Sequence, residues 1–324
     1  MSALSLGGGG IGGTWGPRTR QESVATVREA VDAGITLIDV APAYGNGEAE
    51  MVIGEAFGGR LPPHVRVVSK CALFARWSTV RQRLIETPLT PDLLAAMVER
   101  SVSESLARLN LERLDVLLLH DPIVLTNDDP GEPGIERGLV GEYVRPIFEG
   151  LVARGRVGAW GLSGTGTASA VLEVLGEDPP PSVVQIEANV LRSRFATGSS
   201  ERTPATPELI AAANRRGVGV MGIRPTQSGA LTDAFDRPVN AAAALDFRQA
   251  EPFRGVARGL GVPPARLAHR YALSIPGVST VTLGVKNRDE LREALAAEAE
   301  GPLDPSLVAR IDAAVAPPSQ LTSG

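Results

Sequence analysis

Short apolar runs alternate with amphipathic stretches along almost the whole chain. The amphipathic stretches repeat their apolar positions every three or four residues, which is the period of a helix with one buried face. Residues 21–33 are an example, with Val24, Val27 and Val31 on one side. The apolar runs predict buried strands at residues 4–6, 35–39, 65–70, 114–120, 157–162, 182–188, 218–223 and 280–285.

A helical pattern follows each of these runs. Strands that alternate with helices indicate βαβ units and a parallel sheet. Eight such units in a chain of 324 residues fit an α/β protein with a closed (β/α)8 barrel, which we expect to be a single domain over residues 1–324. The expected helices are 21–33, 49–57, 91–109, 143–154, 167–175, 207–216, a helical region after residue 241, and 288–297.

Two connections, residues 72–90 and 121–142, are too long to be simple turns. Loops of this length are uncommon and are usually functional or disordered. Both follow strands at the expected C-terminal face of the barrel, so we expect them to wall a substrate pocket, with Phe74 and Trp77 as apolar contacts. The proline-containing tail, residues 316–324, is expected to be flexible.

Composition narrows the class of protein. The chain is 43% apolar and 21% charged, which is typical of a globular protein. Its net charge of −5, with no clustered basic stripe, argues against nucleic-acid binding. A single cysteine, Cys71, fits a reducing compartment, and no apolar stretch approaches the roughly 18 residues that a membrane helix needs. We therefore expect a soluble cytoplasmic protein without nucleic-acid or membrane partners.

Lysine is almost absent. Of the 32 lysine and arginine residues, only Lys70 and Lys286 are lysines. Arginine cannot replace an ammonium that must be compact or change its protonation state. Lys70 ends one predicted strand, as Asp39 and His120 end two others, and Tyr44 follows Asp39 by five residues. The C-terminal ends of parallel barrel strands meet at one mouth, so these side chains predict a proton-transfer site there.

The glycine run 7–12 satisfies the pattern G-x-G-x-x-G of dinucleotide-binding folds. That fingerprint requires its last glycine to open a helix directly, so that the helix N-terminus meets a pyrophosphate. Here residues 14–17 intervene and the predicted helix begins near Gln21. We therefore do not interpret the run as this fingerprint.

Several motifs together resemble the aldo-keto reductase superfamily, along essentially the whole chain. They include Gly-Gly-Thr14-Trp15, the segment 38–48, Trp-Gly-Leu-Ser at 160–163, and Leu-Gly-Val-Lys-Asn at 283–287. The family's catalytic tetrad is an aspartate, a tyrosine five residues later, and a lysine and a histidine that end the next two strands. The residues that match this tetrad in type, order and position are Asp39, Tyr44, Lys70 and His120.

The resemblance implies hydride transfer between a nicotinamide and a carbonyl carbon, without a metal. Tyr44 would be the general acid, since the neighbouring Lys70 ammonium favours the phenolate and lowers the phenol pKa. Asp39 would hold Lys70 charged, and His120 would donate a hydrogen bond to the carbonyl oxygen. The cofactor-binding residues implied by the same resemblance are Thr14, Trp15, Ser163, Gln185, Ile223, Arg224, Thr226, Gln227, Ser228, Gly284, Lys286 and Glu290.

The chain departs from the family pattern near the predicted cofactor site. Gly164 stands where the family usually has an asparagine after the serine that binds the carboxamide. Asn189 stands near the position where many members of the family have an aromatic residue. Ile223 and Arg224 replace a tyrosine that stacks under the nicotinamide and a serine that begins the pyrophosphate loop. We expect Ile223 to pack on the ring, and Arg224 to bind a cofactor phosphate bidentately.

The cofactor and the reaction remain open at this point. Lys286 favours the 2′-phosphate of NADP, whereas Glu290, in place of the family's arginine, favours NAD. Because NADP is the more frequent cofactor in the family, we expect NADP here, with NAD also usable. The substrate would be a small carbonyl compound, alcohol or sugar. The alternatives are a nicotinamide-binding sensor like the β-subunits of potassium channels, or a non-redox lyase that uses the same tetrad.

Overall fold

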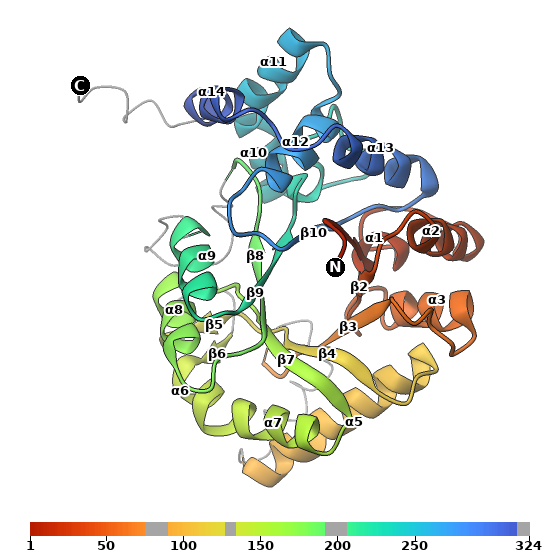
Figure 1. Ribbon diagram of the computed structural model, residues 1–324, viewed down its shortest axis with the longest axis vertical. Coiled ribbons are helices and arrows are strands. Elements are labelled where there is room, and N and C mark those ends of the chain that lie inside the picture. The colour runs from red at the N-terminus through yellow and green to blue at the C-terminus, as the bar shows by residue number, and fades with distance from the viewer. Residues whose placement is uncertain (75–89, 127–133, 192–205, 316–324) are drawn as a thin grey trace.

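Parallel strands form the centre of the protein. A computed structural model describes residues 1–74, 90–126, 134–191 and 206–315. Eight strands close into a barrel, and helices surround it, which confirms the predicted (β/α)8 fold (Figure 1). In their order around the barrel the strands are β1 (Leu4–Gly7), β2 (Leu37–Asp39), β3 (Arg66–Cys71), β4 (Leu114–Leu119), β7 (Val157–Ser163), β8 (Val183–Glu187), β9 (Gly219–Ile223) and β10 (Thr280–Leu283).

The barrel closes where the first strand pairs with the last. Leu4 of β1 lies opposite Val281 of β10, and Leu6 lies opposite Leu283. The hydroxyls of Ser5 and Thr282 are 2.9 Å apart in a buried hydrogen bond across this seam. The seam thus joins the two ends of the chain beneath the mouth of the barrel.

Most predicted helices are present close to their predicted positions. Thr90 caps the longest of them, because its hydroxyl accepts a hydrogen bond from the N–H of Leu93. None of the helices among the described residues is long and apolar enough to cross a membrane. The helices that follow barrel strands are α2 (Arg20–Asp32), α3 (Glu48–Phe57), α5 (Pro91–Leu109), α7 (Arg145–Ala153), α8 (Ala168–Gly176), α9 (Thr206–Arg215) and α13 (Arg288–Ala299).

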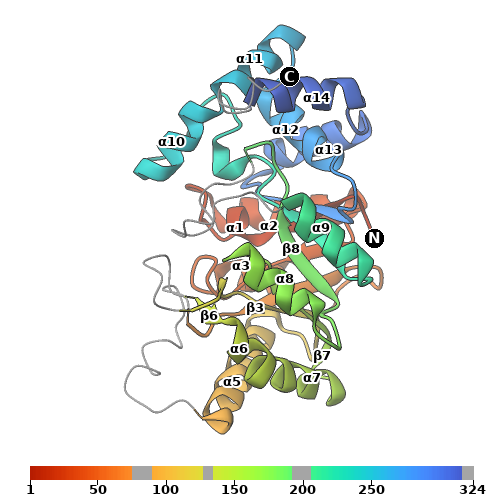
Figure 2. The same cartoon turned by 90° about the vertical axis from the view of Figure 1, so that its left-hand side faces the viewer.

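A group of further helices lies at one end of the molecule in both views (Figures 1 and 2). The sequence predicted only one helical region here. The group has an apolar core of its own, which includes the fully buried Phe253 and Ile311. The members of this group are α10 (Ala241–Gln249), α11 (Glu251–Leu260), α12 (Pro264–Leu273) and α14 (Pro305–Val315).

The connections contain more regular structure than the sequence predicted. The glycine run forms a four-residue helix, α1 (Gly8–Ile11). The described part of the segment 121–142 contains two short parallel strands, a three-residue helix and the start of a π-helix. In the other long connection, Phe74 packs against the main core. Trp77 and the tail 316–324 lie outside the described residues. The added elements are β5 (Ile123–Val124), β6 (Ile135–Glu136), α6 (Arg137–Leu139), η1 (Val140–Val144) and the 3₁₀ turn η2 (Gln227–Gly229).

Candidate active site

The four residues of the predicted tetrad meet at the C-terminal mouth of the barrel. Lys70 lies in β3 with its side chain wholly buried, and its ammonium makes three hydrogen bonds. The ammonium nitrogen lies 2.7 Å from Asp39 Oδ1, 3.0 Å from the carbonyl oxygen of Val40 and 3.2 Å from the hydroxyl of Tyr44. These contacts use all three protons of the ammonium. His120 directly follows β4, and its ring meets that of Tyr44 edge-on, with 5.7 Å between centroids.

A tight turn after β2 positions Tyr44. The N–H of Tyr44 donates to the carbonyl of Ala41, and its carbonyl accepts from the N–H of Ala49 in α3. Gly45 has a left-handed φ of 65°, and a Cβ at this position would lie 2.1 Å from the carbonyl oxygen of Gly12. The turn therefore requires glycine, and it fixes the phenol over Lys70.

The charge states follow from burial and neighbours. Burial alone would lower the pKa of Lys70, but the Asp39 carboxylate and Tyr44 more than offset it, so the pKa is raised and the ammonium stays charged. Burial lowers the pKa of His120 well below its ordinary value, and the positive charges of Lys70 and Arg224 lower it further. At neutral pH the site therefore combines a charged ammonium with a neutral imidazole.

A cavity of about 610 Å³ opens above the tetrad and runs past the ends of β7, β8, β9 and β10. Asp39, Tyr44 and His120 line it, whereas Lys70 lies beneath them. Phe74 is not among its lining residues. The predicted cofactor residues that line the cavity are Thr14, Trp15, Ser163, Gln185, Ile223, Arg224, Thr226, Ser228, Gly284, Lys286 and Glu290.

Gln227 is the predicted cofactor residue that does not line the cavity. Its side chain is buried inside the loop after β9. Its Oε1 accepts a hydrogen bond from Asn189 Nδ2, and its Nε2 donates to Asp246 Oδ2, each at 3.0 Å. Gln227 therefore ties the loop to α10 and shapes the cavity from behind.

Two buried polar groups in the cavity lack a partner among the described residues. They are the hydroxyl of Ser163 and the side-chain nitrogen of Gln185, which are 3% exposed as residues and lie opposite each other on β7 and β8. An unsatisfied buried polar group costs free energy, so such a pair indicates a polar ligand. The carboxamide of a nicotinamide offers both an acceptor and donors, and these two side chains fit it. A Cβ on Gly164 would lie 2.7 Å from the carbonyl oxygen of Gln185, so glycine allows the close approach here.

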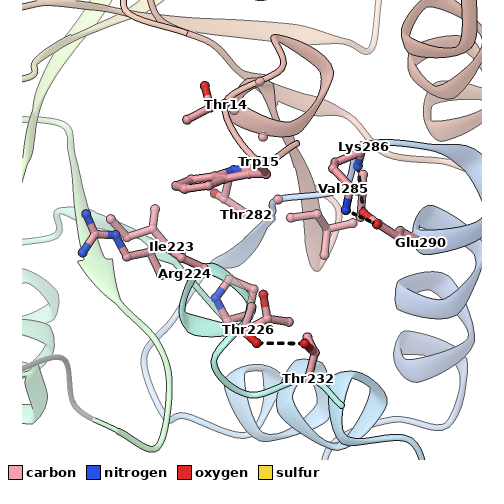
Figure 3. Close-up of a pocket in the computed structure, with 18 of the residues that line it drawn as sticks. Thr14, Trp15, Ile223, Arg224, Thr226, Thr232, Thr282, Val285, Lys286 and Glu290 are labelled. Atoms are coloured by element: carbon pink, nitrogen blue, oxygen red, sulfur yellow. Dashed lines mark hydrogen bonds and ion pairs between the residues drawn. The ribbon is translucent and has the colours of Figure 1, made fainter. Parts of the chain in front are cut away.

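The far end of the cavity is rich in carboxylates. Lys286 forms an ion pair with Glu290 (Figure 3), and a second ion pair with Asp236 at 2.9 Å. Its backbone N–H also donates to Glu290 Oε2, at 2.9 Å. Burial lowers the pKa of Lys286, but hydrogen bonds to the two carboxylates more than offset this, so the pKa is raised. Asp233 and Glu293 also line the cavity.

Arg224 does not lie near this end. Figure 3 shows its guanidinium on the side of the cavity away from Lys286 and Glu290. The guanidinium instead donates from Nη1 to Glu187 Oε1 at 2.7 Å. The backbone of Arg224 is left-handed (φ 54°), and its side chain lies beside Glu187 of β8, while the expected contact with a cofactor phosphate stays a prediction.

Arg237 and His269 were not among the predicted site residues. Arg237 bridges two walls of the cavity, donating to the carbonyls of Trp15 at 3.3 Å and Ser228 at 2.8 Å. His269 of α12 also lines the cavity. Contacts between residues about 220 positions apart leave no local pattern, so periodicity cannot reveal them. No group of three or more metal-ligating side chains was found among the described residues.

Comparison with known proteins gives the relatives of this chain. A sequence profile of the aldo/keto reductase family matches residues 3–316. The chain is similar to L-galactose dehydrogenase of Arabidopsis thaliana, with 26% identity over 330 residues that cover 99% of this chain and 93% of that one. It is also similar to the NADH-specific methylglyoxal reductase of Escherichia coli K12, with 32% identity over 124 residues that cover 37% and 38% of the two chains.

Solved structures show the same fold. The holo form of the aldo-keto reductase AKR11C1 from Bacillus halodurans superposes with a TM-score of 0.69 at 20% identity. The superposition covers 97% of this chain and 92% of that one. A likeness at this identity carries the (β/α)8 architecture, while the family assignment comes from the sequence profile.

Proposed function

This chain belongs to the aldo/keto reductase family, and we propose that it transfers a hydride between a nicotinamide dinucleotide and a small carbonyl compound or alcohol, with Tyr44 as general acid and base. The observation that carries the proposal is the buried Lys70, whose ammonium contacts both Asp39 and the Tyr44 hydroxyl. An ion pair with a purely structural role would not need a tyrosine hydroxyl beside its ammonium at the floor of a cavity.

The side chains suggest a division of labour. In the reductive direction, the substrate carbonyl oxygen accepts hydrogen bonds from Tyr44 and from the neutral His120, which stabilise charge as it develops on that oxygen. Tyr44 then gives up its proton, and Lys70 stabilises the phenolate that remains. Asp39 keeps Lys70 charged and oriented. The bound nicotinamide supplies the hydride in this direction and accepts it in the reverse one.

Ser163 and Gln185 are the residues that would hold the carboxamide and so fix which part of the ring faces the tetrad. Both are buried, line the cavity and lack other partners among the described residues. Trp15 and Ile223 line the same cavity and offer apolar surface. Holding the reactants in one orientation is a large part of catalysis in a reaction that needs little covalent chemistry from the protein.

We propose NAD as the preferred dinucleotide, although family frequency favours NADP. Lys286 is already paired with Asp236 and Glu290, and Asp233 and Glu293 add two more carboxylates to the lining of the cavity. A 2′-phosphate would have to compete with two carboxylates for one ammonium, whereas a ribose diol can donate to Glu290. Each unpaired contact between like charges costs on the order of 1 kcal/mol at a partly exposed site.

Calorimetric titration of the protein with NAD⁺ and NADP⁺ tests this preference. We expect NAD⁺ to bind at least about tenfold more tightly, which corresponds to ~1.4 kcal/mol. Glu290→Gln should reduce the ratio of NAD⁺ affinity to NADP⁺ affinity several-fold. Glu99→Gln, on the distant helix α5, should leave this ratio unchanged. Tighter binding of NADP⁺ to the unmodified protein would show that Glu290 does not govern the choice.

Isotope transfer tests the reaction itself. The protein is incubated with a panel of aldehydes, ketones and sugars and with nicotinamide dinucleotides that carry deuterium at C4. Hydride transfer places deuterium on the former carbonyl carbon, as mass spectrometry would show. A lyase would give product without deuterium, and a sensor would bind the dinucleotide without turnover.

A further inference from the structure

Arg224 is held in place at both ends. Its backbone lies in the left-handed region at the end of β9, and its carbonyl oxygen accepts a hydrogen bond from Asn189 Nδ2 at 3.0 Å. Its guanidinium is fixed by Glu187, the last residue of β8, whose side chain is 9% exposed. A non-glycine residue in this conformation is uncommon and costs free energy, so the surrounding contacts must compensate for it.

The Arg224 side chain lies on the wall of the cavity that also holds three of the tetrad residues. Arg224 lines the cavity, and its side chain is 40% exposed. Its side chain points away from the carboxylate-rich end where Lys286 and Glu290 lie (Figure 3). Its positive charge is also close enough to His120 to lower the pKa of that imidazole. Glu187 itself does not line the cavity, so a substrate meets the arginine and not its partner.

The hydrogen bonds leave one edge of the guanidinium available. Glu187 is the only side chain bonded to it among the described residues, and it takes Nη1. Nε and Nη2 form the opposite edge of the planar group. Two parallel N–H groups on such an edge match the two oxygens of a carboxylate. Glu187 already offsets the charge of the guanidinium, so an anion would be held mainly by these two N–H groups, and a monoanion would meet less repulsion from Glu187 than a doubly charged phosphate.

We infer that the substrate is an oxo acid, or the corresponding hydroxy acid, whose carboxylate is bound by Arg224 while its carbonyl group lies at Tyr44 and His120. This inference rests on the proposed function and adds the substrate class to it. Glu187 acts as a positioning residue, because it orients the guanidinium without contacting the substrate. A cation built into the cavity wall beside the reacting groups selects for charge as well as size.

The test compares oxo acids with aldehydes of the same chain length. Glyoxylate and 4-oxobutanoate are paired with acetaldehyde and butanal, and kcat/KM is measured for each. We expect the protein to prefer at least one of the acids by about 100-fold or more, because a site built for a polar group rejects an analogue that lacks it. Butanedioate, which cannot react, should inhibit competitively and bind in calorimetry.

Variants assign the preference to Arg224. Arg224→Met keeps much of the side-chain length and should reduce the acid-to-aldehyde ratio by about 100-fold, mainly through KM, and abolish butanedioate binding. Glu187→Gln should reduce the same ratio by a smaller factor. Arg216→Met removes a surface arginine that pairs with Asp178 and should leave the ratio unchanged. Unfolding temperature and dinucleotide affinity confirm that each variant is folded.

The outcomes separate the two proposals. If aldehydes receive deuterium but oxo acids are not preferred, or if Arg224→Met leaves the ratio unchanged, the substrate inference is wrong and the hydride transfer stands. If a phosphorylated aldehyde such as glyceraldehyde 3-phosphate is preferred over every oxo acid, the carboxylate assignment is also wrong. If no carbonyl compound receives deuterium, the proposed function itself fails.

Discussion

The hydroxyl of Tyr44 lies 3.2 Å from the Lys70 ammonium, so removal of this one oxygen is the most specific change available at the residue scale. Tyr44→Phe keeps the ring and its edge-on contact with His120 but has no proton to transfer. We expect turnover to fall by roughly 10²–10⁴-fold, the usual contribution of a general acid. Steady-state kinetics measure the loss, while dinucleotide affinity should stay nearly unchanged. Tyr143→Phe is the control, and equal rates for both variants would mean that the proton comes from another group.

Sequence reasoning predicted that the tetrad residues would meet, because each stands at or just after the end of a strand and parallel strands share one mouth. It could not predict the direction of Arg224. That direction depends on a left-handed backbone and on Glu187, which lies 37 residues earlier. The sequence also could not predict that the Gln227 side chain turns inward, because this depends on its contacts with Asn189 and Asp246.

At the scale of elements, α3 and α5 are joined by a buried carboxylate. Glu50 of α3 is fully buried, and it accepts hydrogen bonds from Arg108 Nε of α5 at 2.6 Å and from Ser69 of β3 at 2.7 Å. Removing one partner of a buried ion pair leaves an uncompensated charge, so Arg108→Met should lower the free energy of unfolding by about 3–5 kcal/mol. Urea denaturation measures this difference.

The same helix offers a matched control. Arg100 pairs with Glu104 one turn away, and both side chains are about half exposed. Exposed pairs of this kind contribute little, so Arg100→Met should change stability by no more than about 0.5 kcal/mol. Similar losses for the two variants would show that burial does not distinguish these pairs.

The amphipathic helices were predictable because each buries one face, which leaves a period in the sequence. The element α1 was not, because glycines carry no apolar periodicity and favour many backbone conformations. The glycines of α1 are packed closely against Val40, Trp15 and Val285, contacts that only the fold brings together. The helices α10, α11, α12 and α14 were only partly foreseen, since they pack on one another and their order in space depends on the fold.

At the scale of the whole molecule, the segments that directly follow β1 and β10 at their seam pack so closely that they leave no space for a side chain at Gly10 of α1. A Cβ there would lie 2.0 Å from the carbonyl oxygen of Val285. Gly10→Ala should therefore push the two sides of the seam apart and destabilise the protein by about 1–3 kcal/mol or more. In contrast, Gly176→Ala at the end of α8 has open space around it and should stabilise by roughly 0.5–1 kcal/mol. Thermal unfolding compares the two, and a neutral Gly10→Ala would mean that the seam can relax.

Stability in acid should depend on His269. Burial lowers its pKa to about 4, whereas the unfolded imidazole titrates near its ordinary value of 6.5. The unfolded state therefore binds more protons between these values, and stability falls as the pH decreases from 6.5 toward 4. Between pH 7 and 4.5 His269 should account for roughly 2–3 kcal/mol of the loss. Urea denaturation at both pH values should show that His269→Leu loses less free energy of unfolding than the unmodified protein. His64→Gln, which replaces an exposed histidine, should lose as much as the unmodified protein.

The two lysines have a consequence for chemical labelling. The Lys70 side chain is wholly buried, and that of Lys286 is 12% exposed, at the wall of the cavity. An acylating reagent that modifies lysine side chains can therefore reach one amine, and only in competition with Asp236 and Glu290. Modification of Lys286 at alkaline pH, followed by mass spectrometry, would report whether a dinucleotide occupies that end of the cavity. With one lysine side chain within reach, the chain thus carries its own lysine-based probe of occupancy.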